Sequence, residues 1–353
     1  MNEKIKCLRE KLRGLDIQGM IISNPVNVKY LTGIDAEGTL LITRKENYYI
    51  TDARYIESVR ATLTIDDEII VSNYTDISEY DYENFFSFCE NVGFEEEYIT
   101  YATYKRYMQK YKANHLEETE SIIEKQRLIK DEQEIEYLER ACELTDNCFS
   151  HLLNFIKIGM TEKQIAFEIE KYFLDHGAEG LAFETIVASG PNSSKPHAIT
   201  TERKIDVGDP ITIDFGCKYK GYCSDMTRTI FMGCILEEIK PVYDLALKNL
   251  ELSTKEITDG YTIKTAANMV ESDFKVNGYN LIHALGHGVG LEVHELPFIR
   301  LKNEANFKEN MVIADEPGIY LPGKYGIRIE DTLLVTKDGS ERLTKSERGY
   351  VVI

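Results

Sequence analysis

The sequence predicts an α+β protein with two domains, and three observations support this prediction. The chain has 353 residues, more than the roughly 150 residues of an average domain. Hydrophobic residues make up 43% and charged residues 29% of the chain, which is typical of a globular protein and excludes a fully disordered one. Helical and strand-like patterns alternate over the first 125 residues, whereas strand-like alternation dominates after residue 180. We therefore expect an α/β domain over residues 1–125 and an α+β domain over residues 126–353.

The elements of the first domain follow from the spacing of its apolar residues and from one polar turn. The polar opening stretch has helical periodicity, and Gly19 leads into a short apolar run that is typical of a strand. Two strand-like runs on either side of residues 44–47 predict a hairpin. We place the end of this domain within residues 115–130, where the sequence becomes polar and weakly patterned. The predicted elements are a helix over 3–15, a strand over 19–23, a hairpin of 39–43 and 48–51, and a helix from residue 54.

The second domain opens with two helices that carry start signals. Acidic residues at 131–134 favour a helix start, because the helix dipole stabilises negative charge in the first turn. Thr161 and Gln164 form a capping box at the start of the next helix, and Gly177 ends it. We expect the later helices to pack on one face of a mainly antiparallel sheet. The predicted strands are 183–188, 211–215, 225–231, 312–316 and 327–335, and the predicted later helices are 242–257 and 263–277.

Charge and cysteine usage exclude several classes of protein. The chain has 41 Lys and Arg against 60 Asp and Glu, so its net charge of −19 disfavours binding to a nucleic-acid backbone. No apolar run approaches the roughly 18 residues of a membrane-spanning helix. The seven cysteines contain no Cys-x-x-Cys pair, which is typical of a reduced protein of the cytoplasm. We therefore expect a cytoplasmic protein with neither a nucleic-acid nor a membrane partner.

Two aspartates lie inside adjacent strand-like runs. Alternation places Asp214 on the face opposite Ile213 and Phe215, and it places Asp225 on one face with Thr227. If the two runs form a hairpin, the carboxylates lie side by side, and a proton or a cation between them relieves their repulsion. The alternative is that each aspartate has only a structural role.

Three of the seven histidines, His283, His287 and His294, fall within twelve residues of a glycine-rich segment. Histidine is a common metal ligand and an acid–base group that titrates near neutral pH. The glycines allow the backbone to approach a bound group closely, but they do not form the Gly-x-Gly-x-x-Gly loop of a dinucleotide site. We interpret this segment as functional, in preference to three separate structural histidines.

Two further carboxylates occur among apolar residues. Glu316 precedes a Pro-Gly pair, and alternation places Glu330 on the same face as Arg328. A structural ion pair between Arg328 and a carboxylate is the alternative interpretation.

The charges of these acids match a pair of metal ions. Asp214, Asp225, Glu316 and Glu330 carry four negative charges, and His287 adds one neutral nitrogen, so the set neutralises two divalent cations. Oxygen ligands with one imidazole suit Mn²⁺, Co²⁺, Fe²⁺ or Zn²⁺. Two such ions lower the pKa of a shared water and prepare it to attack a carbonyl group.

These motifs resemble the pita-bread metallopeptidases, in the branch of Xaa-Pro aminopeptidases and Xaa-Pro dipeptidases (prolidases). The resemblance covers essentially the whole chain, and residues 24–33 are similar to the creatinase-type N-terminal domain of that branch. It implies a C-terminal pita-bread fold preceded by a smaller α/β creatinase-type domain. The motifs that carry it are residues 183–197, the Asp214 and Asp225 pair, the histidine segment, residues 316–318 and residues 328–331.

The resemblance also implies how the metal ions are held. Asp214 would chelate one ion, and His287 and Glu316 would bind the other. Asp225 and Glu330 would bridge the two ions. The family implies Mn²⁺ as the leading candidate, with Co²⁺, Zn²⁺ and Fe²⁺ as alternatives.

Four more roles come from the resemblance alone. His294 would donate to the tetrahedral intermediate, and Glu316 would also shuttle a proton. His197 and His283 would position the substrate. Arg328 would orient a metal-binding carboxylate or meet the carboxylate of the substrate.

The implied activity is hydrolysis of the Xaa-Pro bond at the N-terminus of short proline-containing peptides, by a homodimer. This bond has no N–H, and a site that grips the amino terminus and the carbonyl group through metals needs none. Dipeptidases of the family often have arginine directly after His-Glu-x-Pro, whereas this chain has Phe298 there and Arg300 two residues later. This departure favours an aminopeptidase over a strict dipeptidase. The alternatives on the same scaffold are an amidinohydrolase and a non-catalytic binding protein, which lack the complete ligand set.

Overall fold

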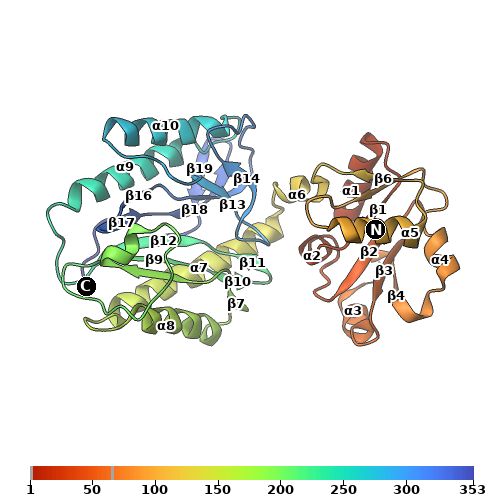
Figure 1. Cartoon of the computed structure of the whole chain (residues 1–353), viewed down its shortest axis with the longest axis horizontal. Helices are drawn as coiled ribbons and strands as arrows, with labels where there is room; N and C mark the ends of the chain where they lie inside the picture. The colour runs from red at the N-terminus through yellow and green to blue at the C-terminus, as the bar shows by residue number, and fades with distance from the viewer. Residues whose placement is uncertain (1–2, 65–66) are drawn as a thin grey trace. The chain divides into compact units, whose positions relative to one another are not determined.

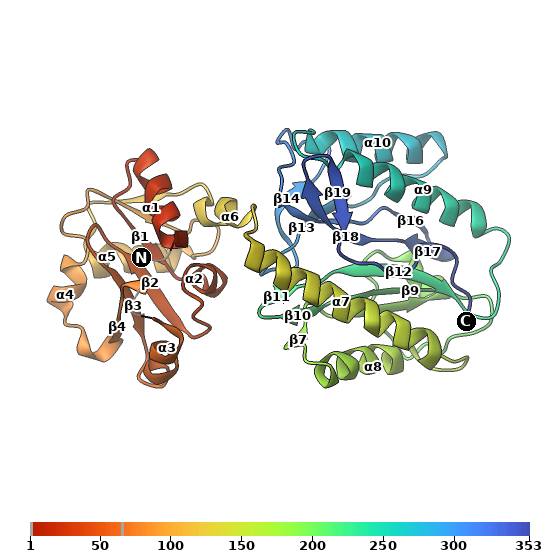
Figure 2. The same cartoon turned by 180° about the vertical axis from the view of Figure 1, so that it is seen from behind.

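A computed structural model describes residues 3–64 and 67–353. The chain divides into two compact units, of which the first ends at Arg127 and the second begins at Leu128. Figure 1 and Figure 2 show the units from opposite sides, with the colour running from red at the N-terminus to blue at the C-terminus. In the described ranges, no helix combines the length and the apolar character that crossing a bilayer requires.

The first unit is built on a six-stranded mixed sheet with the order β4-β3-β2-β1-β5-β6. Strands β1, β2 and β3 pair antiparallel with one another in turn, and the other neighbours in the sheet pair parallel. The predicted hairpin is confirmed, with Leu40 opposite Tyr49. The elements are α1 (Glu3–Gly14), β1 (Gly19–Ile22), α2 (Pro25–Thr32), β2 (Gly38–Ile42), β3 (Asn47–Thr51), α3 (Ile56–Thr62), β4 (Ile69–Asn73), the 3-10 turn η2 (Tyr74–Asp76), α4 (Glu79–Asn84), β5 (Asn91–Phe94), α5 (Tyr101–Tyr111), β6 (His115–Glu118) and α6 (Ile122–Arg127).

Local signals explain the first helices of this unit. Ile5, Leu8 and Leu12 recur at helical spacing along α1, and all three are buried. Asn24 caps α2 through its side chain, and Gly33 ends that helix with a φ of 73°, a conformation that glycine adopts without strain. The α/β character predicted for this region is therefore present as a mixed sheet with helices.

The second unit contains antiparallel strand pairs and two pairs of helices. Its larger sheets have the orders β12-β9-β8 and β14-β13-β15-β18-β19. The elements are α7 (Glu132–Phe155), α8 (Glu162–Asp175), β7 (Gly180–Leu181), β8 (Ile186–Ser189), the 3-10 turn η3 (Gly190–Ser194), β9 (Pro210–Phe215), β10 (Cys217–Tyr219), β11 (Tyr222–Cys223), β12 (Met226–Phe231), α9 (Lys240–Glu256), α10 (Ile263–Val276), β13 (Gly286–Gly288), β14 (Glu295–Ile299), β15 (Val312–Asp315), β16 (Gly318–Leu321), β17 (Tyr325–Arg328), β18 (Asp331–Thr336) and β19 (Gly339–Arg342).

The helices of the second unit form two layers on the strands. Figure 1 and Figure 2 show α9 and α10 on one side of the strands and α7 and α8 on the other. Ile169 and Phe173 of α8 pack with Ile213 of β9 in one core, and Leu250 of α9 packs with Ile313 of β15 in a second core. The two later helices, α9 and α10, therefore lie together on one side of the strands, and α7 and α8 add a layer on the other side that the sequence did not predict.

The start signals of α7 and α8 are confirmed as capping boxes. Asp131 accepts from the backbone N–H of Glu134, and Thr161 accepts from that of Gln164. In both boxes the side chain three residues on returns a hydrogen bond to the cap. Gly177 follows α8 with a φ of 90°.

The prediction of one strand over residues 327–335 is wrong. Residues up to Arg328 belong to β17, which pairs with β16, and residues from Asp331 belong to β18, which pairs with β15. The chain changes sheets at Glu330, whose backbone N–H donates to the carbonyl of Thr227 at 3.0 Å. The predicted strand over 183–188 likewise begins only at Ile186.

The packing of α9 predicts a large difference between two truncations. Leu250 is 0% exposed, whereas Val276 at the end of α10 is 86% exposed. We expect Leu250→Ala to lower the free energy of unfolding by about 2–5 kcal/mol, because it leaves a cavity in the core. Val276→Ala is the control and should change it by less than about 0.5 kcal/mol. Urea denaturation measures both variants, and equal effects would show that α9 does not pack as described.

Candidate metal centre

Two paired strands place the first two carboxylates of the candidate site. Strands β9 and β12 pair antiparallel, with Asp214 opposite Thr227, and Asp225 directly precedes β12. The hairpin expected from the sequence is therefore present. Asp225 is buried, and Asp214 is partly buried.

The other ligand candidates come from the neighbouring sheet. His287 lies on β13, which pairs with β14 on one side and β15 on the other. Glu316 directly follows β15, and Glu330 lies where the chain passes from β17 to β18. One cavity of about 500 Å³ is lined by all nine residues that the sequence singled out, namely His197, Asp214, Asp225, His283, His287, His294, Glu316, Arg328 and Glu330.

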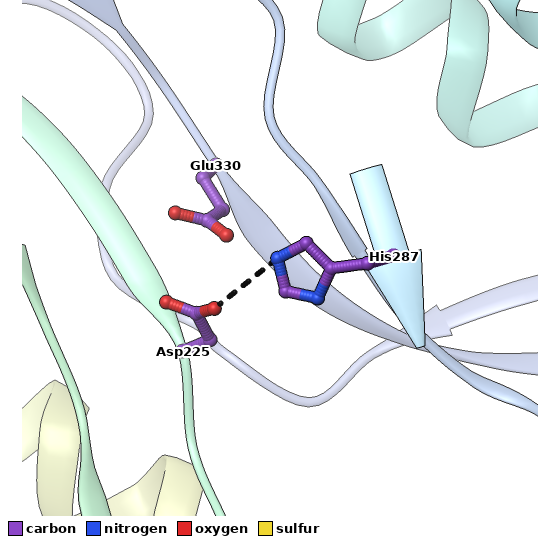
Figure 3. A group of neighbouring side chains, drawn as sticks. All are labelled: Asp225, His287 and Glu330. Atoms are coloured by element: carbon purple, nitrogen blue, oxygen red, sulfur yellow. Dashed lines mark ion pairs between the residues drawn. The ribbon is translucent and has the colours of Figure 1, made fainter. Parts of the chain in front are cut away.

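Asp225, His287 and Glu330 form a tight cluster with metal-ligand chemistry. One ligand atom of each lies within 4.8 Å of the others, and the three residues are 4%, 4% and 2% exposed. Figure 3 shows the three side chains reaching toward one another from separate segments of the chain. The Nε2 atom of His287 is 3.6 Å from Asp225 Oδ2 and 3.6 Å from Glu316 Oε1, which is too long for a good hydrogen bond.

The imidazole of His287 is neutral in this arrangement. Its Nδ1 atom lies 3.1 Å from the carbonyl oxygen of Gly288, so Nδ1 carries the hydrogen and Nε2 keeps its lone pair. Burial, and to a smaller extent the neighbouring His294, lower the pKa of His287 to about 4. A lone pair and two carboxylate oxygens thus face one another, which is the arrangement that a cation between them stabilises.

The carboxylates repel one another in a medium of low dielectric constant. Burial raises the pKa of Asp225 well above its usual value, and the charges of Glu330, Asp214 and Glu316 raise it further. Burial and Glu330 do the same for the pKa of Glu316. Burial and Asp214 raise the pKa of Glu330 to about 8. Four acidic groups with one neutral imidazole therefore fit divalent cations, which remove the repulsion without protons.

Arg328 orients two of these carboxylates. Its Nη2 donates to Asp214 Oδ2 at 2.5 Å, and its Nε donates to Thr227 Oγ1 at 3.1 Å. The Thr227 hydroxyl in turn donates to Glu330 Oε2 at 2.6 Å. The sequence placed Thr227 on the face of Asp225 without assigning it a role.

His283 has protein partners at both ring nitrogens. Its Nδ1 lies 2.7 Å from the carbonyl oxygen of Ala284, and its Nε2 lies 3.1 Å from the hydroxyl of Tyr320. Tyr320 also accepts from Arg328 Nη1 at 2.7 Å. No role for Tyr320 was predicted from the sequence.

His294 and His197 lie at the exposed side of the cavity. The ring centroids of His294 and His287 are 4.3 Å apart, and partial burial lowers the pKa of His294. His197 follows η3 on a loop and makes no hydrogen bond through its ring to the described residues. Both side chains are therefore accessible to a molecule that enters the cavity.

A buried ion pair between Arg228 and Asp331 connects two segments that carry site residues, and the sequence gave no indication of it. Arg228 donates to Asp331 at 2.6 Å and to the backbone oxygen of Thr227 at 2.9 Å. It also donates to the backbone oxygen of Glu330. Arg228 therefore ties the strand that follows Asp225 to the segment that carries Glu330.

Comparisons with known proteins match this chain over both units. The creatinase/prolidase N-terminal domain matches residues 4–129, and metallopeptidase family M24 matches residues 136–337. A Xaa-Pro dipeptidase of Pyrococcus horikoshii is 35% identical over 99% of this chain and 99% of that protein. A solved Xaa-Pro dipeptidase from Bacillus anthracis matches with a TM-score of 0.93 at 32% identity, over 99% of each chain. A solved X-Pro aminopeptidase from Thermotoga maritima matches with a TM-score of 0.88 at 32% identity, over 98% of this chain and 100% of that chain.

The chain therefore belongs to metallopeptidase family M24. The predicted fold is confirmed as a creatinase-type N-terminal domain followed by a pita-bread domain. The protein is a peptidase, a hydrolase whose family uses divalent metal ions.

The raised carboxylate pKa values predict a pH effect on the metal-free protein. The folded protein holds the proton of Glu330 up to about pH 8, whereas the unfolded chain releases it near pH 4.5. The folded state then binds more protons, so the free energy of unfolding falls as pH rises from about 4.5 to about 8. Urea denaturation in the presence of a chelator measures this trend, and Glu330→Gln should flatten it. Stability that rises over this range would contradict the account.

Proposed function

We propose that this enzyme hydrolyses the Xaa-Pro bond at the N-terminus of short proline-containing peptides, with two divalent metal ions, Mn²⁺ first among them. The observation that carries the proposal is the convergence of Asp225, His287 and Glu330 on one point of a cavity that also holds Glu316 and Asp214. The names of the relatives, Xaa-Pro dipeptidase and X-Pro aminopeptidase, support the substrate class. The intact set of ligand candidates argues against an amidinohydrolase or a non-catalytic protein.

The proposal assigns each ligand candidate to one of the two ions or to both. Asp214 would hold one ion, His287 and Glu316 would hold the other, and Asp225 and Glu330 would bind both. When bound, the ions polarise the scissile carbonyl group and lower the pKa of the attacking water. The chain's own task is to hold the carboxylates in place, and Arg328 and Thr227 do this by hydrogen bonding.

The remaining site residues act on the peptide and on the proton. His294 stabilises the oxyanion of the tetrahedral intermediate, because it lies at the exposed side of the cavity beside His287. His197 would position the peptide from the loop that follows η3. Glu316 accepts the proton of the water and passes it to the leaving nitrogen. Arg328 has most of its donors engaged inside the protein, and we therefore assign it to orienting Asp214.

His283 keeps a role in substrate positioning that is indirect. Its ring nitrogens form hydrogen bonds with the carbonyl oxygen of Ala284 and the hydroxyl of Tyr320, and that hydroxyl accepts a hydrogen bond from Arg328. His283 therefore shapes the cavity wall against which the peptide lies.

The cavity wall also bears on the length of the peptide. Phe298 lines the cavity at the position where dipeptidases of this family often carry arginine, and the guanidinium of Arg300 lies 4.6 Å from the Phe298 ring centroid. Arg300 lines the cavity as well, so the cation of this chain is displaced from position 298, where those dipeptidases carry it. We therefore expect the enzyme to accept Ala-Pro-Ala at least as well as Ala-Pro.

The proposal also covers the domain boundaries, the cellular location and the oligomeric state. Residues 126–353 form the catalytic domain, and residues 1–125 form the N-terminal domain. The enzyme works in the cytoplasm, in keeping with seven cysteines that are all free thiols. It is a homodimer, and a monomer by light scattering at micromolar concentration would contradict this part of the proposal.

The direct test of the function is hydrolysis of Ala-Pro-Ala and Ala-Pro by enzyme incubated with Mn²⁺. We expect release of free alanine, loss of activity with a chelator, and recovery when Mn²⁺ is restored. Leu-Gly-Gly, which lacks proline, serves as the matched control peptide. No hydrolysis of either proline peptide with bound Mn²⁺ would overturn the proposal.

Asp225→Asn tests the bridging carboxylate. We expect it to abolish activity and to lower bound metal, because it removes one charge from the buried cluster. Asp338→Asn is the matched control, since Asp338 is exposed in the turn between β18 and β19. Metal content by mass spectrometry and turnover of Ala-Pro-Ala are the measurements. A fully active Asp225→Asn enzyme would exclude the proposed bridge.

His294→Ala separates catalysis from metal binding. We expect turnover to fall by roughly 10²–10³-fold while metal content stays near that of the wild type, because the imidazole acts on the oxyanion. Loss of metal together with activity would show that His294 is a ligand instead.

A further inference from the structure

Glu162 is a buried carboxylate that lies outside the metal centre and has an unusual number of donors. It is the first residue of α8 and is 0% exposed. Its Oε1 accepts from the backbone N–H and the hydroxyl of Ser189, at 2.7 and 2.8 Å. Its Oε2 accepts from Asn192 Nδ2 at 2.9 Å and from the backbone N–H and hydroxyl of Thr201, at 2.9 and 2.6 Å. Five hydrogen bonds thus end on one side chain.

The direction of these hydrogen bonds requires a carboxylate. Arg203 donates to the hydroxyl oxygen of Ser189 at 2.6 Å, and its backbone N–H donates to that of Thr201 at 3.1 Å. Each hydroxyl has only one hydrogen, and that hydrogen is therefore available for Glu162. The Arg203 guanidinium is itself held by both oxygens of Asp209, at 2.6 and 2.9 Å. Every partner of Glu162 is a donor, so only an acceptor at both oxygens satisfies them.

The partners of Glu162 enclose the loop that carries His197. Ser189 ends β8, Asn192 lies in η3, and Thr201 follows the loop, so residues 189–201 are tied at three points. Asn192 Nδ2 also closes the loop by donating to the carbonyl of Ile199 at 3.0 Å.

The same loop touches the metal centre directly. The backbone carbonyl of Pro196 accepts from Arg328 Nη1 at 3.1 Å, and Pro196 and His197 both line the cavity. An exposed histidine on a loop contributes to binding only if the loop holds it in place before the peptide arrives. The anchor of the loop therefore supports the wall of the cavity without lining it.

We propose that Glu162 is a positioning residue that fixes the 189–201 loop and so holds His197 against the peptide. This inference rests on the proposed function, in which His197 meets the substrate. If Glu162 had only a structural role, its substitution would lower the stability of the protein and would reduce activity by the same factor with or without His197.

A double-mutant cycle on kcat/KM for Ala-Pro-Ala with Mn²⁺ tests the proposal. Glu162→Gln turns an amide NH₂ toward at least two donors in either orientation, so it breaks the anchor. We expect it to lower kcat/KM about tenfold in the wild-type background and by less than about twofold in the His197→Ala background. Glu202→Gln is the matched control, because Glu202 is an exposed glutamate beside Thr201. Bound metal should stay at the wild-type level in all variants.

Equal losses in the two backgrounds would overturn the proposal, and so would a His197→Ala enzyme with wild-type kcat/KM. If Glu162→Gln does not fold, Thr201→Val replaces it in the cycle, because it removes one donor hydroxyl and keeps the shape of the side chain. A wild-type enzyme that fails to cleave Ala-Pro-Ala would instead refute the proposed function. The two failures are therefore distinguishable.

Discussion

Mutual repulsion among four carboxylates is the constraint on which the rest of this protein depends. Asp225 and Glu330 are buried beside Glu316 and Asp214, and burial together with like charge raises the pKa of Asp225, Glu316 and Glu330. A protein keeps such a cluster only if cations or protons compensate for it. Arg328 supplies one positive charge within the site, and divalent ions supply the rest. Binding of divalent ions thus offsets the cost of assembling the acids in the metal-free state.

The scaffold meets this constraint with rigid strands and buried polar anchors. The ligand candidates lie on β9 and β13, directly before β12, directly after β15 and at the junction of β17 with β18, and not in long loops. Arg228 and Asp331 join the segments that carry Asp225 and Glu330. The 189–201 loop has its own anchor in Glu162, and it is also joined to the metal centre where the carbonyl of Pro196 accepts from Arg328.

Much of the site was predictable from the sequence, because acidic residues occur within otherwise apolar strand-like runs. Asp214 and Glu330 stand out beside isoleucines, and His287 stands out among glycines. The change of sheet at Glu330 was not predictable, because every second residue is apolar both before the break, at Ile327 and Ile329, and after it, at Leu333 and Val335. Glu162 looked like an ordinary acid in the first turn of a helix, and only the folded chain brings Ser189 and Thr201 to it. Arg228 pairs with Asp331 across 103 positions of the sequence, which no local pattern reveals.

Anomalous diffraction from a crystal soaked in Mn²⁺ examines the central claim most directly. The account predicts two manganese peaks in the cavity, with Asp225 and Glu330 in contact with both and His287 in contact with one. A saturated crystal with no peak between these side chains, or with the carboxylates turned away from one another, would contradict it.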